Sequence, residues 1–210
     1  SKSLSSVSAL FSSFNGYFIV QMTHLNLLQS FSFIPWALLF TEKLVTGKEP
    51  RAILWLGFIL AQMILIGYPQ TFINAVIILV IYAVIRNWQE KIPNLLKITV
   101  AVLIAILLSA IQLVPLFELV KQSDALSAAT GQRYIHPLPI KNLLSVFYPF
   151  IFGNPAQGTY SYYGKGWPIF WENLLYIGII PFLVLVMSAT KRENFGKKKS
   201  FMIFCIACLI

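Results

Sequence analysis

Apolar runs of roughly the length needed to cross a lipid bilayer recur along this sequence. A hydrocarbon core about 30 Å thick needs about 20 residues of helix. The candidate spans are residues 4–20, 27–40, 52–66, 72–85, 98–117 and 174–188, with a seventh beginning at residue 200. Only 11% of the residues are charged, against about a quarter in a soluble domain, so few polar groups remain to cover a soluble surface. We therefore predict an all-α, polytopic transmembrane helix bundle of about six spans plus a truncated seventh.

The same pattern divides the chain into three parts. We expect transmembrane helices one to five in residues 1–117, and one long extracytoplasmic, aromatic-rich loop in residues 118–172. Residues 173–210 would hold helix six, a basic cytoplasmic loop and the start of helix seven. The sequence begins without a cleavable signal pattern and ends inside an apolar run. We therefore expect a fragment of a longer protein.

Lysine and arginine residues gather in alternate connections between the candidate spans, as they do in cytoplasmic loops of membrane proteins. The residues in these connections are Lys2, Lys43, Lys48, Arg51, Arg86, Lys91, Lys97, Lys191, Arg192, Lys197, Lys198 and Lys199. The remaining basic residues all lie within residues 118–172. This distribution predicts a multi-pass protein of the inner or plasma membrane, with a cytoplasmic N-terminus and the long loop outside. It also explains the net charge of +9 without a nucleic-acid partner.

The predicted outer face collects polar residues and turn formers at the ends of the spans. They are His24 and Asn26 in the first outer turn, Gly67, Tyr68, Pro69 and Gln70 in the second, and Gln112, Pro115 and Glu118 at the end of the fifth span. Turns need such residues in any case, which explains Gly67 and Pro69 equally well. An acid beside an apolar span is costly to submerge unless it is paired, so Glu118 is a site candidate, with interfacial solvation as the alternative. A lone histidine such as His24 is more often a satisfied interfacial side chain than a base.

The predicted loop of residues 118–172 is far longer than ordinary connections, and its second half is dense in aromatic residues. One interpretation is membrane anchoring, because tyrosine and tryptophan rings settle at the headgroup level of a bilayer. The other is a binding surface, in which rings such as Tyr163 and Trp167 contact a sugar or an isoprenoid chain, and polar side chains such as Glu172 bind hydroxyls. Arg133 is the outer residue best suited to grip a phosphate at two points, and a solvated charge is the alternative.

Several known site motifs are absent from the sequence. It contains no P-loop, no dinucleotide-binding glycine fingerprint, no paired zinc motif and no nucleophile elbow. None of its acidic residues forms a close pair, and Cys205 and Cys208 lie in an apolar run, as buried structural thiols do. We therefore assign no catalytic residue and no metal ligand, and the cofactor stays unknown.

A series of short motifs runs in order along most of the chain. They are Ser13-Phe14-Asn15-Gly16-Tyr17 followed by His24, Phe33-Ile34-Pro35-Trp36, Gly67-Tyr68-Pro69-Gln70, Ser109-Ala110-Ile111-Gln112-Leu113-Val114-Pro115 followed by Glu118, Tyr148-Pro149-Phe150-Ile151-Phe152-Gly153, and Glu172-Asn173 followed by Tyr176-Ile177-Gly178. In this order and spacing the chain resembles the YfhO family of bacterial membrane proteins, which belong with the polytopic glycosyltransferases of the C type.

The resemblance implies transfer of a sugar from a polyprenyl-phosphate donor on the outer face of a bacterial cell membrane. The family's catalytic acid would lie in a first outer loop upstream of this sequence, so no residue here takes its role. The family's Ser-x-Arg pattern is also altered, since Ser123 and Arg133 stand apart.

The leading hypothesis is therefore part of an integral membrane glycosyltransferase-like protein. Its expected partners are membrane lipid, a polyprenyl-phosphate-linked sugar and an acceptor that is an envelope glycopolymer or a lipid. The expected substrate-binding residues are His24, Tyr68, Gln70, Gln112, Glu118, Arg133, Tyr163, Trp167 and Glu172.

Two other classes of function stay open. A transporter or flippase for a lipid-linked precursor predicts intramembrane charges and broken helices near mid-span. The sequence places almost no charge inside the spans, and Pro35 is the main interruption that it predicts. A non-catalytic scaffold would use the aromatic loop only as an anchor.

Overall fold

The computed structural model describes residues 16–47, 49–86, 91–122, 140–160, 170, 174–176, 178–179 and 183. These residues are mostly helical, and no β-strand occurs among them. By their contacts, the chain divides into two compact units. We call Leu25–Leu126 with Arg192–Ile210 the bundle unit, and Ser1–His24 with Ser127–Lys191 the loop unit. This grouping does not test the three parts predicted from the sequence, which stay a prediction.

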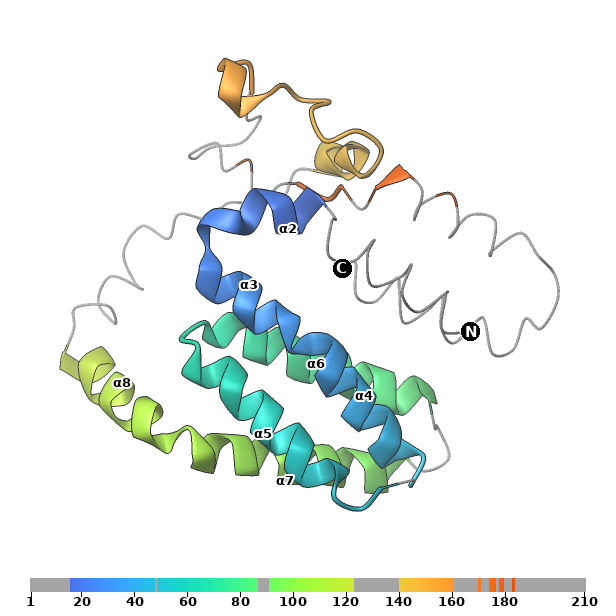
Figure 1. Ribbon diagram of the computed structural model, residues 1–210, viewed down its shortest axis with the longest axis vertical. Helices are drawn as coiled ribbons and strands as arrows, with labels where there is room; N and C mark the ends of the chain where they lie inside the picture. The colour runs from blue at the N-terminus through green and yellow to red at the C-terminus, as the bar shows by residue number, and fades with distance from the viewer. Residues whose placement is uncertain are drawn as a thin grey trace, which may run out of the picture. The chain divides into compact units, whose positions relative to one another are not determined.

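The bundle unit is built around α5. Its described helices are α3 (Leu25–Ser32), α4 (Ile34–Val45), α5 (Ala52–Leu65), α6 (Pro69–Arg86), α7 (Lys91–Leu108) and α8 (Ala110–Gln122) (Figure 1). α5 packs most extensively against α7 and α4, and α6 packs against α7, α4 and α5. Because α5 is apolar on nearly every side, it is suited to a place inside the bundle.

Small residues bring α5 and α7 close together. A Cβ atom added at Gly57 would lie 2.7 Å from Ile104 Cγ2 and 3.1 Å from the Ala101 carbonyl oxygen. Ala101 and Ala105 are fully buried on the facing side of α7. Leu56 and Leu60 of α5 fill the core beside them. The close approach of these two helices therefore depends on residues with little or no side chain.

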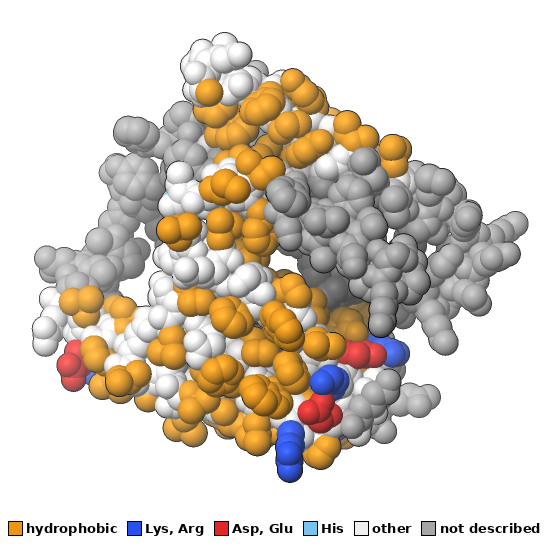
Figure 2. Space-filling view, in the orientation of Figure 1, with side chains coloured by type: hydrophobic (Ala, Val, Ile, Leu, Met, Phe, Trp, Pro, Cys, Tyr) orange, Lys and Arg blue, Asp and Glu red, His pale blue; other side chains and the backbone are white. Residues whose placement is uncertain are grey.

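Charged side chains tie the ends of α4 and α6 together. Arg86 donates hydrogen bonds to both oxygens of Glu42, at 2.9 Å from Nη2 to Oε1 and 3.0 Å from Nε to Oε2. The Tyr82 hydroxyl donates to Glu42 Oε2 at 2.8 Å, and Lys43 Nζ lies 2.8 Å from Glu49 Oε2. Figure 2 shows charged side chains at the edges of the bundle unit and hydrophobic side chains over the area between them.

The predicted polytopic bundle of about six spans plus a truncated seventh is wrong. Among the described residues, α6 is the one helix that is long and apolar enough to cross a membrane. α7 and α8 would add a second span only if this bent pair counts as one. The predicted span 52–66 forms α5, whose 14 residues extend about 21 Å, well short of a hydrocarbon core.

Backbone interruptions explain why apolar runs did not become spans. The predicted span 27–40 is divided at Phe33 into α3 and α4, and Pro35 lies in the first turn of α4, where its missing N–H is tolerated. The predicted span 98–117 is broken at Ser109, where α7 and α8 are bent by 74°. Apolar side chains continue across both breaks, so the hydropathy pattern predicts one continuous span where the backbone forms two helices. The predicted span 72–85 lies inside α6.

The other predicted spans fall largely outside the described residues. Of residues 4–20, the structure describes only α2 (Gly16–Val20), and it describes few of residues 174–188 and none from residue 200 onward. The short helices η1 (Gln21–Thr23), η2 (Ile140–Val146) and η3 (Pro155–Gln157) complete the described elements of the loop unit.

Contacts distant in sequence hold the loop unit together. The Gly16 N–H donates to the Tyr176 carbonyl at 3.2 Å, and the Leu175 N–H donates to Ser145 Oγ at 3.1 Å. The Phe150 and Phe170 rings stack with their centroids 6.0 Å apart. Helix α2 and residues 140–160 are therefore both attached to the segment around residues 170–176.

Candidate functional site: an apolar groove along α8

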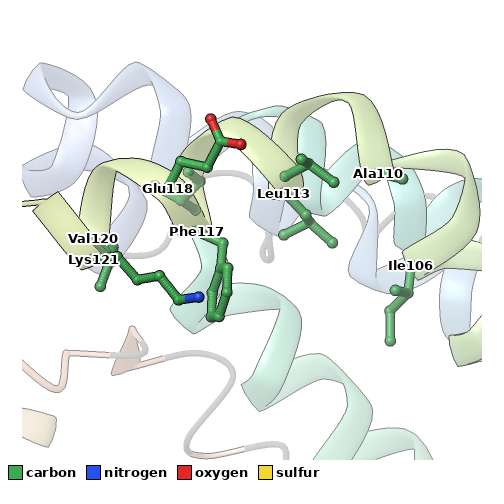
Figure 3. Close-up of a pocket in the computed structure, with 9 residues that line it drawn as sticks. Ile106, Ala110, Leu113, Phe117, Glu118, Val120 and Lys121 are labelled. Atoms are coloured by element: carbon green, nitrogen blue, oxygen red, sulfur yellow. The ribbon is translucent and has the colours of Figure 1, made fainter.

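An open groove of about 650 Å³ follows α8 in the bundle unit (Figure 3). Its volume falls within the roughly 300–1,000 Å³ typical of small-molecule sites. The lining residues are Ile106, Ala110, Leu113, Val114, Leu116, Phe117, Glu118, Val120 and Lys121. Among the described lining residues nearly all are apolar, and the charged ones are Glu118 and Lys121, near the C-terminal end of α8. Such a groove is suited to a long apolar ligand that carries a polar group at one end.

The groove is open because α8 turns away from the bundle. None of the 13 residues of α8, all of which the structure describes, is buried. Figure 1 shows α8 continuing beyond the end of α7, away from α4, α5 and α6. α8 therefore presents an apolar surface that the described helices leave uncovered, and uncovered apolar surfaces of this kind mark interaction sites.

The bend at Ser109 is built from local hydrogen bonds. The Ser109 N–H and hydroxyl both donate to the Ala105 carbonyl, at 3.0 and 2.6 Å. The N–H groups of Gln112 and Leu113 both donate to the Ser109 carbonyl at 3.0 Å, so α8 starts from this residue. A serine hydroxyl that bonds back to the preceding turn bends a helix. The sequence had indicated Pro35 as the main interruption of the spans, and the break at Ser109 was missed.

Gln112 and Gly67 bring the second predicted outer turn close to the end of the predicted fifth span. A Cβ atom at Gly67, whose φ is +86°, would lie 3.6 Å from Gln112 Nε2. The turn between α5 and α6 thus lies against the start of α8. Tyr68 is half-buried in this turn, where its carbonyl accepts from Thr71, and Gln70 is exposed at the start of α6. Three predicted site residues, Tyr68, Gln70 and Gln112, therefore belong to one region of the bundle unit.

Glu118 and Lys121 differ in their surroundings. The Lys121 ammonium lies 4.5 Å from the centroid of the Phe117 ring, a cation–π contact. The Glu118 carboxylate makes no ion pair or hydrogen bond with any other described residue. Figure 3 shows its carboxylate pointing away from the Lys121 ammonium. The two charges are thus separate, and each is accessible to a ligand in the groove.

The remaining predicted site residues lie elsewhere. His24 follows η1 in the loop unit and is exposed, with Nδ1 3.2 Å from the Thr23 hydroxyl. Arg133, Tyr163, Trp167 and Glu172 lie outside the described residues. No group of three or more His, Cys, Asp or Glu side chains that could hold a metal ion occurs in the described part of the chain.

The sequence interpretation missed the groove itself and the cation beside it. The signal was present: residues 106, 110, 113, 114, 117 and 121 recur at helical spacing and form one stripe. We had assigned residues 106–117 of this stripe to a continuous span, and Lys121 to the loop that follows it. Only the bend at Ser109 turns it into the lining of a groove.

No family model matches the chain, and no curated protein or solved structure has significant similarity to it.

Proposed function

We propose that the groove along α8 holds the apolar chain of a lipid-linked substrate. The observation that carries this proposal is an apolar groove of about 650 Å³ with a lysine near one end. A polyprenyl phosphate matches this arrangement, because it has a long hydrocarbon chain and an anionic phosphate at one end. The hydrocarbon chain would bury the side chains of Leu113, Val114 and Phe117, whose exposure to water is unfavourable.

The phosphate of such a ligand would lie beside Lys121. A lysine ammonium binds phosphate as a point charge, and its flexible stem allows it to leave the Phe117 ring for a stronger partner. Glu118 cannot stabilise an anion, but a carboxylate accepts hydrogen bonds from hydroxyls. It therefore suits the sugar rather than the phosphate.

The protein would act in a bacterial cell membrane. α6 supports this location, because its 18 residues extend about 27 Å and have a mean hydropathy of 1.7. We propose that α6 crosses the bilayer with Arg86 on the cytoplasmic side, and that α7 returns beside it, so that the start of α8 lies near Gly67 at the outer end of α6. The substrate groove is then reached from within the lipid, where a polyprenyl chain resides.

Sugar transfer is the reaction that this assignment favours. The order of motifs that resembles the YfhO family supports a polyprenyl-phosphate sugar as the donor, and an envelope glycopolymer or a lipid as the acceptor. The chain would contribute substrate binding through the groove, and none of its residues is assigned as the catalytic acid.

The break at Ser109 favours a second candidate, a transporter or flippase for a lipid-linked precursor. Transporters commonly form their substrate sites at broken helices, where the backbone is interrupted inside the membrane. The 74° bend lies directly beside the groove, since Ile106 and Ala110 line it. Both candidates need the same lipid-binding groove and differ in what happens to the sugar.

Binding of a polyprenyl-phosphate sugar to the full-length protein in proteoliposomes tests the groove. Leu113→Trp fills the groove and is expected to abolish saturable binding. Ile77→Trp adds the same ring to the exposed face of α6 and should leave binding unchanged. Lys121→Gln is expected to weaken binding about fivefold, since an exposed charge pair contributes up to about 1 kcal/mol, and to leave binding of the uncharged polyprenol unaltered. Equal binding by the Leu113→Trp and Ile77→Trp variants would refute the assignment.

The two candidates separate in the same proteoliposomes. Transfer releases free polyprenyl phosphate as sugar appears on an acceptor. Transport moves the intact lipid-linked sugar to the other leaflet, where an added membrane-impermeant enzyme can reach it. Release without movement supports the transferase, and movement without release supports the transporter.

A further inference from the structure

α8 is exposed along most of its length and is apolar on every side. Each residue from Val114 to Gln122 is exposed, and the polar side chains among them are Glu118, Lys121 and Gln122. Successive residues of a helix are rotated by about 100°, so its exposed large apolar side chains point in all directions. They are Ile111, Val114, Leu116, Phe117, Leu119 and Val120. A helix that is apolar all round is typical of a protein core or of a membrane, and α8 is not in a core.

The ligand proposed for the groove would cover only part of this surface. Ile111 and Leu119 do not line the groove, and their side chains are 82% and 64% exposed. They point away from the groove, so a chain bound there leaves them uncovered. The rest of α8 therefore needs a second apolar environment.

The lengths of α7 and α8 explain why the chain turns at Ser109 if α7 crosses a bilayer. The 18 residues of α7 extend about 27 Å, close to the hydrocarbon thickness of about 30 Å. A straight continuation through the 13 residues of α8 would add about 20 Å and place Phe117, Leu119 and Val120 in water. The 74° bend instead keeps α8 close to the level at which α7 ends (Figure 1).

We infer that α8 lies within the outer leaflet of the bilayer, just below the headgroups and nearly parallel to the membrane plane. The start of α8 is close to Gly67, in the turn before α6, and the proposed crossing of α6 puts this turn at the outer surface. The lipid around α8 is thus the same lipid that surrounds α6 and α7. This inference rests on the proposed crossing of α6.

This position makes the groove open sideways into the outer leaflet. With α7 along the membrane normal, the eight residues from Ile111 to Leu119 extend about 12 Å along α8 but change in depth by only about 3 Å. Lys121 is then level with the lipid phosphates, which its long side chain can reach. A lipid-linked ligand enters from the outer leaflet, with its phosphate beside Lys121 and its hydrocarbon chain under the headgroups.

Spin-label depth measurements on the full chain in proteoliposomes test the inference. Single labels are placed at the exposed residues Val100, Ile111 and Leu119, and at Gln70 as a reference for water. Cys205 and Cys208 are replaced by serine in each variant. The labels at residues 111 and 119 should lie within about 4 Å of each other in depth, because of the 74° bend. The label at residue 100 should lie about 12 Å deeper, because eight residues of α7 separate it from the end of that helix.

Three results would overturn the inference. Access of a water-soluble nickel complex to residue 119 equal to that at residue 70 would place α8 in water. A label at residue 119 as deep as the one at residue 100 would mean that α8 runs into the bilayer. Low access of both oxygen and the nickel complex at residue 119, or a short distance between the labels of two copies, would show that protein covers α8.

Binding of a polyprenyl-phosphate sugar, measured in the same proteoliposomes, keeps the two proposals apart. Saturable binding together with any of the three results above would refute only the position of α8. The predicted depths without saturable binding would refute only the ligand proposed for the groove.

Discussion

At the scale of single residues, buried hydroxyls join the helices of the bundle unit. Ser30 of α3 and Thr71 of α6 are both buried, and their hydroxyls are hydrogen-bonded to each other. The Thr71 hydroxyl also donates to the Tyr68 carbonyl at 2.8 Å. A buried hydroxyl left without a partner costs more than the bond itself contributes, so this pair holds α3 to the start of α6.

Thr71→Val is therefore expected to lower the free energy of unfolding by about 1–3 kcal/mol, because it keeps the shape and leaves the Ser30 hydroxyl unpaired. Thr99→Val is the matched control. Its hydroxyl donates to the Leu95 carbonyl at 3.0 Å but is exposed, so we expect a change within about 0.5 kcal/mol. Thermal unfolding of both variants is compared in the same detergent. Equal losses of stability would show that the buried hydrogen bond between Ser30 and Thr71 contributes no more than an exposed one.

Gly57 gives a second prediction at this scale. In the Gly57→Ala variant the new Cβ would meet the Ala101 carbonyl and the branched carbon of Ile104, neither of which can move freely. We expect a loss of about 1–3 kcal/mol, as for overpacked cores. Leu54→Ala, at an exposed position of the same helix, should lose less, and the opposite ranking in thermal unfolding would contradict the close packing of α5 and α7.

At the scale of elements, the sequence predicted where helices occur better than where they end. The apolar runs 52–66 and 72–85 correspond closely to α5 and α6. The runs 27–40 and 98–117 are each divided in two. Whether a helix continues depends on backbone hydrogen bonding at one or two residues. A hydropathy pattern is averaged over many residues, so it does not show where such a break occurs. Of the residues that line the groove, the sequence had singled out Glu118 as a candidate, and its role stays a prediction. The groove itself depends on the bend at Ser109, which the hydropathy pattern does not show.

The bend between α7 and α8 is expected to depend on Ser109 and Pro115. Replacing both by alanine removes the hydroxyl that bonds back to Ala105 and restores an N–H inside α8, both of which favour a continuous helix. The distance between spin labels at the exposed residues Val100 and Leu119 should then increase toward about 28 Å, the length of 19 residues of straight helix. Leu116→Ala is the control, and an unchanged distance in the double variant would place the cause of the bend in tertiary packing.

At the scale of the whole molecule, the proposed crossing of α6 predicts opposite accessibility at its two ends. Gln70 is exposed at the start of α6. At the other end of α6, Arg86 binds Glu42. Lys43, the residue after Glu42, pairs with Glu49. Arg51 follows Glu49 closely in the chain and is exposed. Arg51 therefore marks the end of the bundle unit at which α6 finishes.

A membrane-impermeant thiol reagent added to intact cells should label a Gln70→Cys variant and spare an Arg51→Cys variant, which should react only after permeabilisation. Cys205 and Cys208 are replaced by serine in both strains. Labelling of both variants in intact cells would contradict a crossing by α6, and labelling of Arg51→Cys alone would reverse the proposed orientation.

The central claim is that the groove along α8 binds the chain of a polyprenyl-phosphate-linked sugar. The most direct measurement is photocrosslinking of the full-length protein with a polyprenyl phosphate that carries a photoreactive group along its chain, followed by mass spectrometry of the labelled peptides. We predict labels at Leu113, Val114 and Phe117 that an excess of unlabelled polyprenyl phosphate removes and an excess of phosphatidylcholine does not. Labels spread equally over the exposed faces of α6 and α8, or removed equally by both competitors, would contradict it.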